Sequence, residues 1–278
     1  MPECAAEWVI FTDLDGSLLD HDTYRWDPAL PWLARLRAAQ VPVIITTSKT
    51  AAEVAPLQHS LGLSDTPFIA ENGALVTLPA SWENHPDFPH KIFSADYPSL
   101  CHTLNRLRLE HAFDFRGFSE MTDAEVADIT GLAIGDAALA RRREGSEPLI
   151  WLGNDVELER FAACLKPYQL ALTQGGRFYH VMGEAVSKGH AVEWLTKQYQ
   201  RRAGSAITTL GLGDGPNDRT LLEATQHAVI IKGAVSDKVT LSPEYLGEVY
   251  RTAFPGPWGW SEGLSHYLSQ IITDSLNG

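Results

Sequence analysis

The sequence has few cysteines, few basic residues and no long apolar run, and each shortage excludes a class of protein. The three cysteines, Cys4, Cys101 and Cys164, are odd in number and widely spaced, so they indicate neither a disulfide framework nor a zinc site. No apolar run approaches the roughly 18 residues of a membrane-spanning helix, and Glu3 and Glu7 stand where a signal peptide is basic. We therefore expect a cytoplasmic protein with no visible export signal and no membrane contact.

Positive charge is also scarce, because 22 Lys and Arg residues face 35 Asp and Glu residues and give a formal net charge of -13. This balance argues against a broad surface for nucleic acid or anionic lipid, and a phosphorylated small molecule would need local cations. With 278 residues, 44% hydrophobic and 21% charged, the chain is an ordinary globular protein of one or two domains. The sequence leaves a homo-oligomer possible but unsupported.

Strand and helix patterns alternate at both ends of the chain. Trp8 to Phe11 is a short apolar run before a polar turn, and Val41 to Thr46 is a second, β-branched run after a helical pattern. Near the other end, strands over Ile207 to Leu212 and Ala228 to Ile231 flank a short helix. This alternation predicts an α/β fold with a doubly wound, mostly parallel sheet, in which ligands bind beyond the carboxyl ends of the strands.

The middle of the chain has a different pattern of residues. Four prolines between residues 79 and 98 interrupt it, and helical patterns follow over Leu100 to Glu110, Asp123 to Thr130 and Glu157 to Leu165. We interpret residues 84–183 as an inserted α+β domain and residues 1–83 with 184–278 as the core.

Two pairs of carboxylates follow predicted strands. Asp13 and Asp15 stand two residues apart at the end of the first strand, and Asp214 and Asp218 follow a later one. Because parallel strands end at one edge of a sheet, the four carboxylates can converge there and require a cation. Oxygen ligands without His or Cys favour Mg²⁺ over zinc. Either pair alone is also typical of a turn-stabilising acidic motif.

Polar residues near these carboxylates are candidates for holding a phosphate. Lys188 opens a predicted helix and would bring an ammonium, although a lone lysine is more often a solvated surface residue. Thr47 and Ser48 end the second strand and offer donors to an oxyanion, or cap the next helix. The run Arg141 to Arg143 is expected to be a solvated helix face or loop.

The ordered set Asp13-x-Asp15-Gly16-Ser17, Thr47, Lys188 and Gly213-Asp214-x-x-Asn217-Asp218 resembles the four motifs of phosphatases in the haloacid dehalogenase superfamily. Further segments make the chain similar to the mannosyl-3-phosphoglycerate phosphatase family: Leu19-Asp20-His21-Asp22-Thr23-Tyr24, Ser48-Lys49-Thr50, Glu71-Asn72-Gly73-Ala74, Phe118-Ser119-Glu120-Met121, Thr130-Gly131-Leu132 and Gly175-Gly176-Arg177-Phe178. The resemblance covers nearly the whole chain. It implies a Rossmann-like catalytic core with residues 84–183 as a substrate-specificity cap.

The resemblance also implies a mechanism and its residues. Asp13 would attack phosphorus and form an aspartyl-phosphate, and Asp15 would be the general acid and base. Lys188 and Thr47 would hold the phosphate oxygens, and Asn217 would orient the phosphate or the lysine. The cofactor implied is Mg²⁺, bound by Asp13, Asp15 through its carbonyl, Asp214 and Asp218.

The implied substrate is a phosphorylated sugar-glycerate, and the implied product is the osmolyte mannosylglycerate. Gly175 and Gly176 would let the backbone approach a ligand, and Arg177 would bind the glycerate carboxylate. The rival interpretation is a Gly-Gly hairpin with an exposed arginine. The remaining candidates for contact with the substrate are Ser48, Lys49 and His180.

Other functions stay open from the sequence. A glucosyl-3-phosphoglycerate phosphatase, a Cof-type sugar-phosphate phosphatase and a phosphosugar mutase would share the same motifs. A metal-binding regulatory protein that keeps the fold without catalysis is the alternative from outside the enzymes, and a nucleic-acid binder is disfavoured by the net charge.

Overall fold

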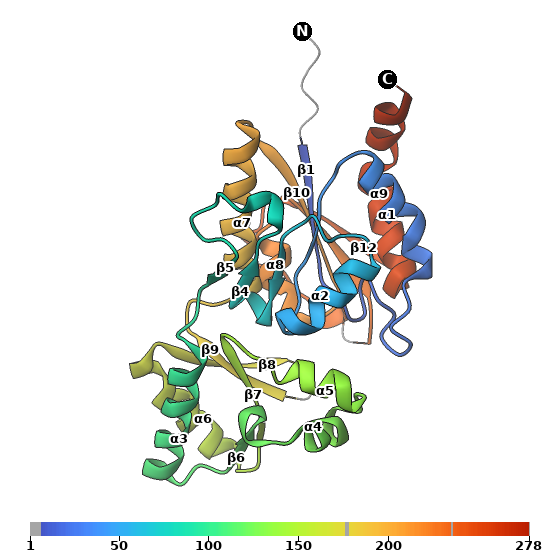
Figure 1. The fold of residues 1–278 in the computed structure, drawn as a ribbon. Coiled ribbons are helices and arrows are strands. Elements are labelled where there is room, and N and C mark those ends of the chain that lie inside the picture. Colours follow the sequence, from blue (N-terminus) through green and yellow to red (C-terminus); the bar gives the residue numbers. More distant parts are fainter. Residues whose placement is uncertain (1–6, 176–177, 235, 278) are drawn as a thin grey trace. The chain divides into compact units, whose positions relative to one another are not determined.

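The computed structural model describes residues 7–175, 178–234 and 236–277 (Figure 1). The chain forms two compact units. The first comprises Met1–Thr47, Asp65–Ile69 and Ser187–Gly278, and the second comprises Ser48–Ser64 and Ala70–Val186. Residues 84–183 therefore all lie in the second unit, which also takes in segments on both sides of Asp65–Ile69.

A five-stranded sheet forms the centre of the first unit. Its strand order is β12 (Glu248–Pro255), β11 (His227–Lys232), β10 (Ile207–Gly213), β1 (Glu7–Thr12) and β2 (Val43–Ile45). All four pairs of neighbouring strands are parallel. β2 and most of β10 and β11 are buried, as continuous apolar strands covered on both faces should be. The prediction of a mostly parallel sheet is confirmed.

Helices cover both faces of this sheet (Figure 1). On one face Gly263 of α9 packs against Val229, and on the other Leu221 of α8 packs against Gly211. The bounds of the α-helices of the unit are α1 (Leu30–Ala38), α7 (Lys188–Ala203), α8 (Arg219–Glu223) and α9 (Gly256–Asn277), and those of its 3-10 helices are η1 (Asp27–Ala29), η6 (Pro216–Asp218) and η7 (Ser236–Lys238). The doubly wound arrangement is thus also confirmed.

A second, three-stranded sheet has the order β3 (Phe68–Ala70), β4 (Leu75–Thr77) and β5 (His90–Ile92). An isolated parallel bridge joins Thr46, just beyond β2, to Ile69 of β3. The neighbouring helices are α2 (Ala51–Ser60), η2 (Glu71–Gly73) and η3 (Ala80–Trp82). Thr50 caps the start of α2, because the Thr50 hydroxyl accepts from the Glu53 N–H at 3.1 Å while the Glu53 carboxylate accepts from the Thr50 N–H at 2.8 Å.

The rest of the second unit is built on a four-stranded antiparallel sheet with the order β6 (Phe115–Gly117), β7 (Ser146–Trp151), β9 (Phe178–Gly183) and β8 (Leu170–Gly175). Its helices are α3 (Tyr97–His111), η4 (Phe118–Glu120), α4 (Asp123–Thr130), α5 (Ile134–Ala140), α6 (Asp155–Leu165) and η5 (Lys166–Tyr168). Leucines of α3 and Phe161 of α6 pack on β7 and β9, and Val126 and Ala137 form a second cluster with Phe118. The helices predicted over this region are confirmed as α3, α4 and α6.

Within the described ranges, no helix has both the length and the apolar composition needed to cross a lipid bilayer.

Candidate functional site

The end of β1 is fixed by buried hydrogen bonds. The Asp13 N–H donates to the Leu212 carbonyl of β10 at 2.9 Å. The Thr12 hydroxyl donates to the Asp13 carbonyl at 2.7 Å and accepts from the Trp260 indole N–H of α9 at 3.0 Å. These contacts hold Asp13 at the carboxyl edge of the sheet, where it is 6% exposed.

The turn after Asp13 lies against the turn after β10. Gly16 has a φ of +78°, and a β-carbon at this position would lie 2.5 Å from Asp214 Oδ2. Only glycine therefore allows the two turns to come this close. The Gly16 N–H donates to the Leu19 carbonyl at 2.9 Å, and Asp15 and Leu19 form a backbone bridge. The two acidic pairs, which are about 200 residues apart in the printed sequence, thus meet at one edge of the sheet.

Asp218 is the fully buried member of the second pair. Its Oδ2 accepts from the backbone N–H groups of Asp214 and Gly215, both at 3.1 Å. Its Oδ1 accepts from the Lys188 ammonium at 2.6 Å. The carboxylate therefore shapes its own turn and also binds the neighbouring cation.

Lys188 is the first residue of α7, and Ser187 caps this helix by accepting from the His190 N–H at 3.0 Å. The Lys188 ammonium donates to Asp13 Oδ1 at 2.7 Å as well as to Asp218. The residue is only 2% exposed. Lys188 is therefore a buried counter-ion between two carboxylates and not a solvated surface lysine.

The electrostatics of this cluster are those of several carboxylates around one ammonium. Burial, and then repulsion by Asp218, raise the pKa of Asp13 well above its ordinary value, although Lys188 opposes the shift. Burial and Asp218 also raise the pKa of Asp214 to about 6. Burial disfavours the charge of Lys188, but Asp13 and Asp218 outweigh this and raise its pKa. The cluster therefore has an excess of negative charge that a further cation would stabilise.

The side chains of Asp13, Asp214 and Asp218 fit a divalent cation, since each offers an oxygen and these atoms lie within 4.8 Å of one another. Carboxylate oxygens without nitrogen or sulfur are the donors that Mg²⁺ prefers. Asp15 is outside this set of side chains, and the role expected for its carbonyl stays a prediction.

Two further predicted residues lie in the first unit. Thr47 is 1% exposed, and its N–H donates to the Ile69 carbonyl at 3.0 Å. Asn217 lies in η6 beside Asp218 and is exposed. Both are near the carboxyl ends of strands, as expected.

The remaining predicted residues belong to the second unit, and their roles stay predictions. Ser48 and Lys49 are half-buried in the loop before α2. Gly175 pairs with Phe178 at the end of the β8–β9 hairpin, and Gly176 and Arg177 lie outside the described residues. His180 is 6% exposed in β9.

Sequence reasoning gave no role to three residues that fix the backbone of a predicted site residue or of its neighbour. Trp260 anchors Thr12, Glu71 donates its N–H to the Lys49 carbonyl at 2.9 Å, and Arg143 donates to the Ser48 carbonyl at 3.0 Å. Glu71 lies in a motif and Arg143 in a basic run that the sequence analysis named, but neither segment indicates these contacts, and no local pattern marks the contact of Trp260. The expectation of a solvated Arg141–Arg143 run is wrong for two of its three residues. Arg143 and Arg141 are half-buried, and Arg141 pairs with Asp123. Arg142 is exposed, as expected.

Comparisons with known proteins agree with this geometry. Residues 10–111 match the model of the haloacid dehalogenase-like hydrolases, and residues 169–268 match that of sucrose-6F-phosphate phosphohydrolase. Among similar solved structures, a haloacid dehalogenase-like hydrolase from B. subtilis has 18% identity and a TM-score of 0.62, with 95% of this chain and 99% of that chain covered. A protein from Bacteroides thetaiotaomicron, studied among phosphatases of the superfamily, has 18% identity and a TM-score of 0.64, with 98% and 97% covered.

A subclass IIB sugar phosphatase of the superfamily is also similar, with 16% identity, a TM-score of 0.60, and 95% of this chain and 98% of that chain covered. At these identities the solved structures show a shared fold alone.

Proposed function

We propose that the chain is a Mg²⁺-dependent phosphatase of the haloacid dehalogenase-like hydrolases, whose family model matches residues 10–111 and one of whose members has a similar fold. The substrate we propose is mannosyl-3-phosphoglycerate, which would be hydrolysed to mannosylglycerate and phosphate. The observation that carries the proposal is the Lys188 ammonium between Asp13 and Asp218, beside a cluster of three carboxylates suited to a metal. Such a cluster suits the transfer of a phosphoryl group to a carboxylate nucleophile.

The chemistry proposed for the first step is attack by a carboxylate oxygen of Asp13 on phosphorus. A bond from this oxygen to phosphorus forms, the ester bond to the leaving oxygen breaks, and Asp15 gives that oxygen a proton. In the second step water attacks phosphorus, Asp15 takes a proton from the water, and the carboxylate of Asp13 is released with inorganic phosphate. The buried ammonium of Lys188 keeps Asp13 in place and neutralises part of the charge that gathers there.

Asp13, Asp214 and Asp218 would hold the magnesium ion, which supplies positive charge to the phosphoryl oxygens when bound. The protein itself holds the nucleophile rigidly, because Asp13 is tied through its N–H to β10 and through its carbonyl to Thr12. A fixed attacking oxygen lowers the entropic cost of reaching the transition state.

The substrate class rests on weaker support than the reaction. The match of residues 169–268 to a sucrose-phosphate phosphohydrolase model and the likeness to a subclass IIB sugar phosphatase favour a phosphorylated sugar. The Ser48-Lys49 pair and the Gly175-Gly176-Arg177 segment, which resemble the mannosyl-3-phosphoglycerate family, favour one that also carries a glycerate carboxylate.

The test is a comparison of kcat/KM for mannosyl-3-phosphoglycerate, glucosyl-3-phosphoglycerate and hexose 6-phosphates, with Mg²⁺ and with EDTA. We expect the first compound to be preferred and the activity to require the metal. Equal activity on simple hexose phosphates would instead favour a Cof-type sugar-phosphate phosphatase, the second candidate supported by the sucrose-phosphate phosphohydrolase match.

Asp13→Asn tests the covalent step, because an amide cannot replace the carboxylate as nucleophile. We expect release of phosphate to fall by at least about a thousandfold. Unchanged activity in this variant would disprove the proposed mechanism, and a wild-type protein inactive on every ester would favour the metal-binding regulatory alternative.

A further inference from the structure

The loop Ser48–Thr50, which leads from β2 to α2, is held by a segment about 90 residues further along the chain within the same unit. The Arg143 guanidinium donates from Nη1 to the Ser48 carbonyl and from Nε to the Ala140 carbonyl, both at 3.0 Å. The Thr50 hydroxyl donates to the Leu139 carbonyl at 3.0 Å. The end of α5 and the residues after it therefore bind both ends of this loop.

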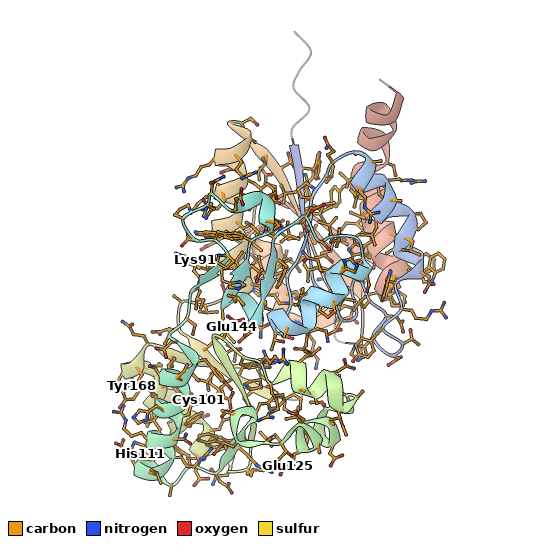
Figure 2. The ribbon with its side chains drawn as sticks, viewed as in Figure 1. Lys91, Cys101, His111, Glu125, Glu144 and Tyr168 are labelled. Carbon is orange, nitrogen blue, oxygen red and sulfur yellow. The ribbon has the colours of Figure 1, made fainter. Side chains whose placement is uncertain are left out.

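Glu71 ties the middle of the loop to the same segment. Its N–H donates to the Lys49 carbonyl at 2.9 Å. Its carboxylate is fully buried and accepts from the N–H groups of Glu144 at 2.8 Å and Gly145 at 3.2 Å and from the Ser146 hydroxyl at 2.6 Å. Glu144, which is labelled in Figure 2, lies in the chain between α5 and β7. Glu71 has a φ of +51°, an unusual conformation for a residue with a side chain, which these contacts maintain.

These contacts fix the backbone on both sides of Lys49. The Ser48 carbonyl belongs to the planar peptide group before the Lys49 α-carbon, and the Lys49 carbonyl belongs to the group after it. Arg143 holds the first carbonyl and Glu71 holds the second. Because both planes are held, the direction in which the Lys49 side chain leaves the backbone is also fixed.

We propose that Arg143 is a positioning residue that sets the direction of Lys49, and through it the affinity for the carboxylate of the substrate. This inference rests on the proposed function, and it adds that Lys49, one of the candidates for contact with the substrate, binds the glycerate carboxylate beside Arg177. Arg143 does not need to touch the substrate for this role. Its planar guanidinium holds the Ala140 and Ser48 carbonyls through two separate nitrogens at a fixed spacing, whereas the donors of a lysine ammonium all lie on one nitrogen.

The neighbouring Arg142 provides a matched control. It has the same charge and is exposed, and within the described ranges its side chain makes no hydrogen bond or ion pair. The variants Arg143→Met and Arg142→Met therefore remove the same charge from the same short segment. Only the first removes a hydrogen bond to the loop that carries Lys49.

The experiment measures kcat and KM for mannosyl-3-phosphoglycerate in both variants, in Lys49→Met and in the double variant of Lys49 and Arg143. We expect Arg143→Met to raise KM about tenfold, with a smaller change in kcat. A tenfold change is the effect of losing one charge-assisted hydrogen bond, here the one between Lys49 and the substrate carboxylate. Arg142→Met is expected to behave as the wild type, and Arg143→Lys is expected to recover only part of the loss.

The double variant separates positioning from a general structural role. If Arg143 acts through Lys49, Arg143→Met raises KM much less when Lys49 is already methionine. Equal effects of Arg143→Met in both backgrounds, or no difference between Arg143→Met and Arg142→Met, would overturn the inference.

Hydrogen exchange of the backbone amides of residues 48–50 tests the inference independently of catalysis. We expect faster exchange in Arg143→Met than in Arg142→Met, and equal rates would again overturn the proposal. A wild-type protein that cleaves no phosphate ester would refute the proposed function, and the exchange rates would still decide whether Arg143 holds this loop.

Discussion

Replacing Lys188 with methionine removes the ammonium between Asp13 and Asp218 and keeps a side chain of similar length. In the wild type this ammonium lies 2.7 Å from one carboxylate and 2.6 Å from the other. All three residues are at most 6% exposed. In Lys188→Met we expect the two carboxylates to stay in place without the cation that they share in the wild type.

The expected loss of stability follows from this geometry. Oxygens of Asp13 and Asp218 lie within 4.8 Å of each other, and two negative charges at about 5 Å repel by roughly 3 kcal/mol at an effective dielectric constant of about 20. Removing one partner of a buried ion pair typically costs about 3–5 kcal/mol. We therefore expect the free energy of unfolding of Lys188→Met to fall by about 3–5 kcal/mol at pH 7.5 without Mg²⁺, a large share of a typical total of about 5–15 kcal/mol.

The loss of stability in Lys188→Met should depend on pH. Burial and Asp218 already raise the pKa of Asp13 in the wild type, and removal of the ammonium raises it further. A folded state with a raised carboxyl pKa binds more protons than the unfolded state, so Lys188→Met gains stability relative to the wild type as the pH falls from 7.5 towards 5. Mg²⁺ should reduce the loss, because it supplies positive charge to the same carboxylates.

The assay is chemical denaturation at pH 7.5 and pH 5.5, with EDTA and with Mg²⁺. The matched control is Lys197→Met, which removes an exposed lysine of the same helix and should change stability by less than about 0.5 kcal/mol. If Lys188→Met is as stable as Lys197→Met at pH 7.5 in EDTA, or if its deficit is the same at both pH values, the electrostatic reasoning is wrong.

Two further predictions concern a close approach and a buried carboxylate. Gly16→Ala places a β-carbon 2.5 Å from Asp214 Oδ2 at a φ of +78°. We therefore expect the free energy of unfolding to fall by about 2 kcal/mol or more and Mg²⁺ to bind more weakly. An unchanged melting temperature and an unchanged Mg²⁺ titration would contradict this. Glu147 is 1% exposed and accepts from the Tyr97 hydroxyl at 2.6 Å and the Ser119 N–H at 2.8 Å. Burial raises its pKa above the ordinary 4.5, so protonation favours the folded state, and the wild type should gain stability relative to Glu147→Gln as the pH falls from 7 towards 4.5. Denaturation midpoints at several pH values measure this difference, and a constant difference would rule out a buried charge as its cause.

Much of the first unit could be predicted from local patterns. Val41 to Thr46 and Ile207 to Leu212 are apolar and rich in β-branched residues, and the structure places β2 and β10 there. Of the four-stranded sheet, the sequence offered only the β8–β9 hairpin, as the rival interpretation of Gly175 and Gly176. β6, with three residues, is too short to show a period. α5 and the edge strand β12 were missed for a related reason, since their exposed positions carry little apolar signal.

In the candidate site, too, local patterns predict some features and miss others. The acidic residues after β1 and β10 could be identified because parallel strands end at a common edge of the sheet, so their convergence follows from the alternation of strands and helices. The burial of Lys188 could not be identified in this way. The Lys188 ammonium contacts Asp13, which lies 175 positions away in the sequence. A solvent-exposed lysine at this position could have the same neighbours in the sequence.

The amino-acid sequence alone determined the class of fold, the edge of the sheet at which the acidic residues gather, and the kind of cation they suit, because these depend on periodicity and residue type. Only the tertiary structure decided that Lys188 is shared by Asp13 and Asp218 and that Arg143 and Glu71 hold the loop of Lys49. These contacts join segments that are distant in the chain, and a hydrogen bond of about 3 Å depends on the packing of the whole unit, which no local pattern records.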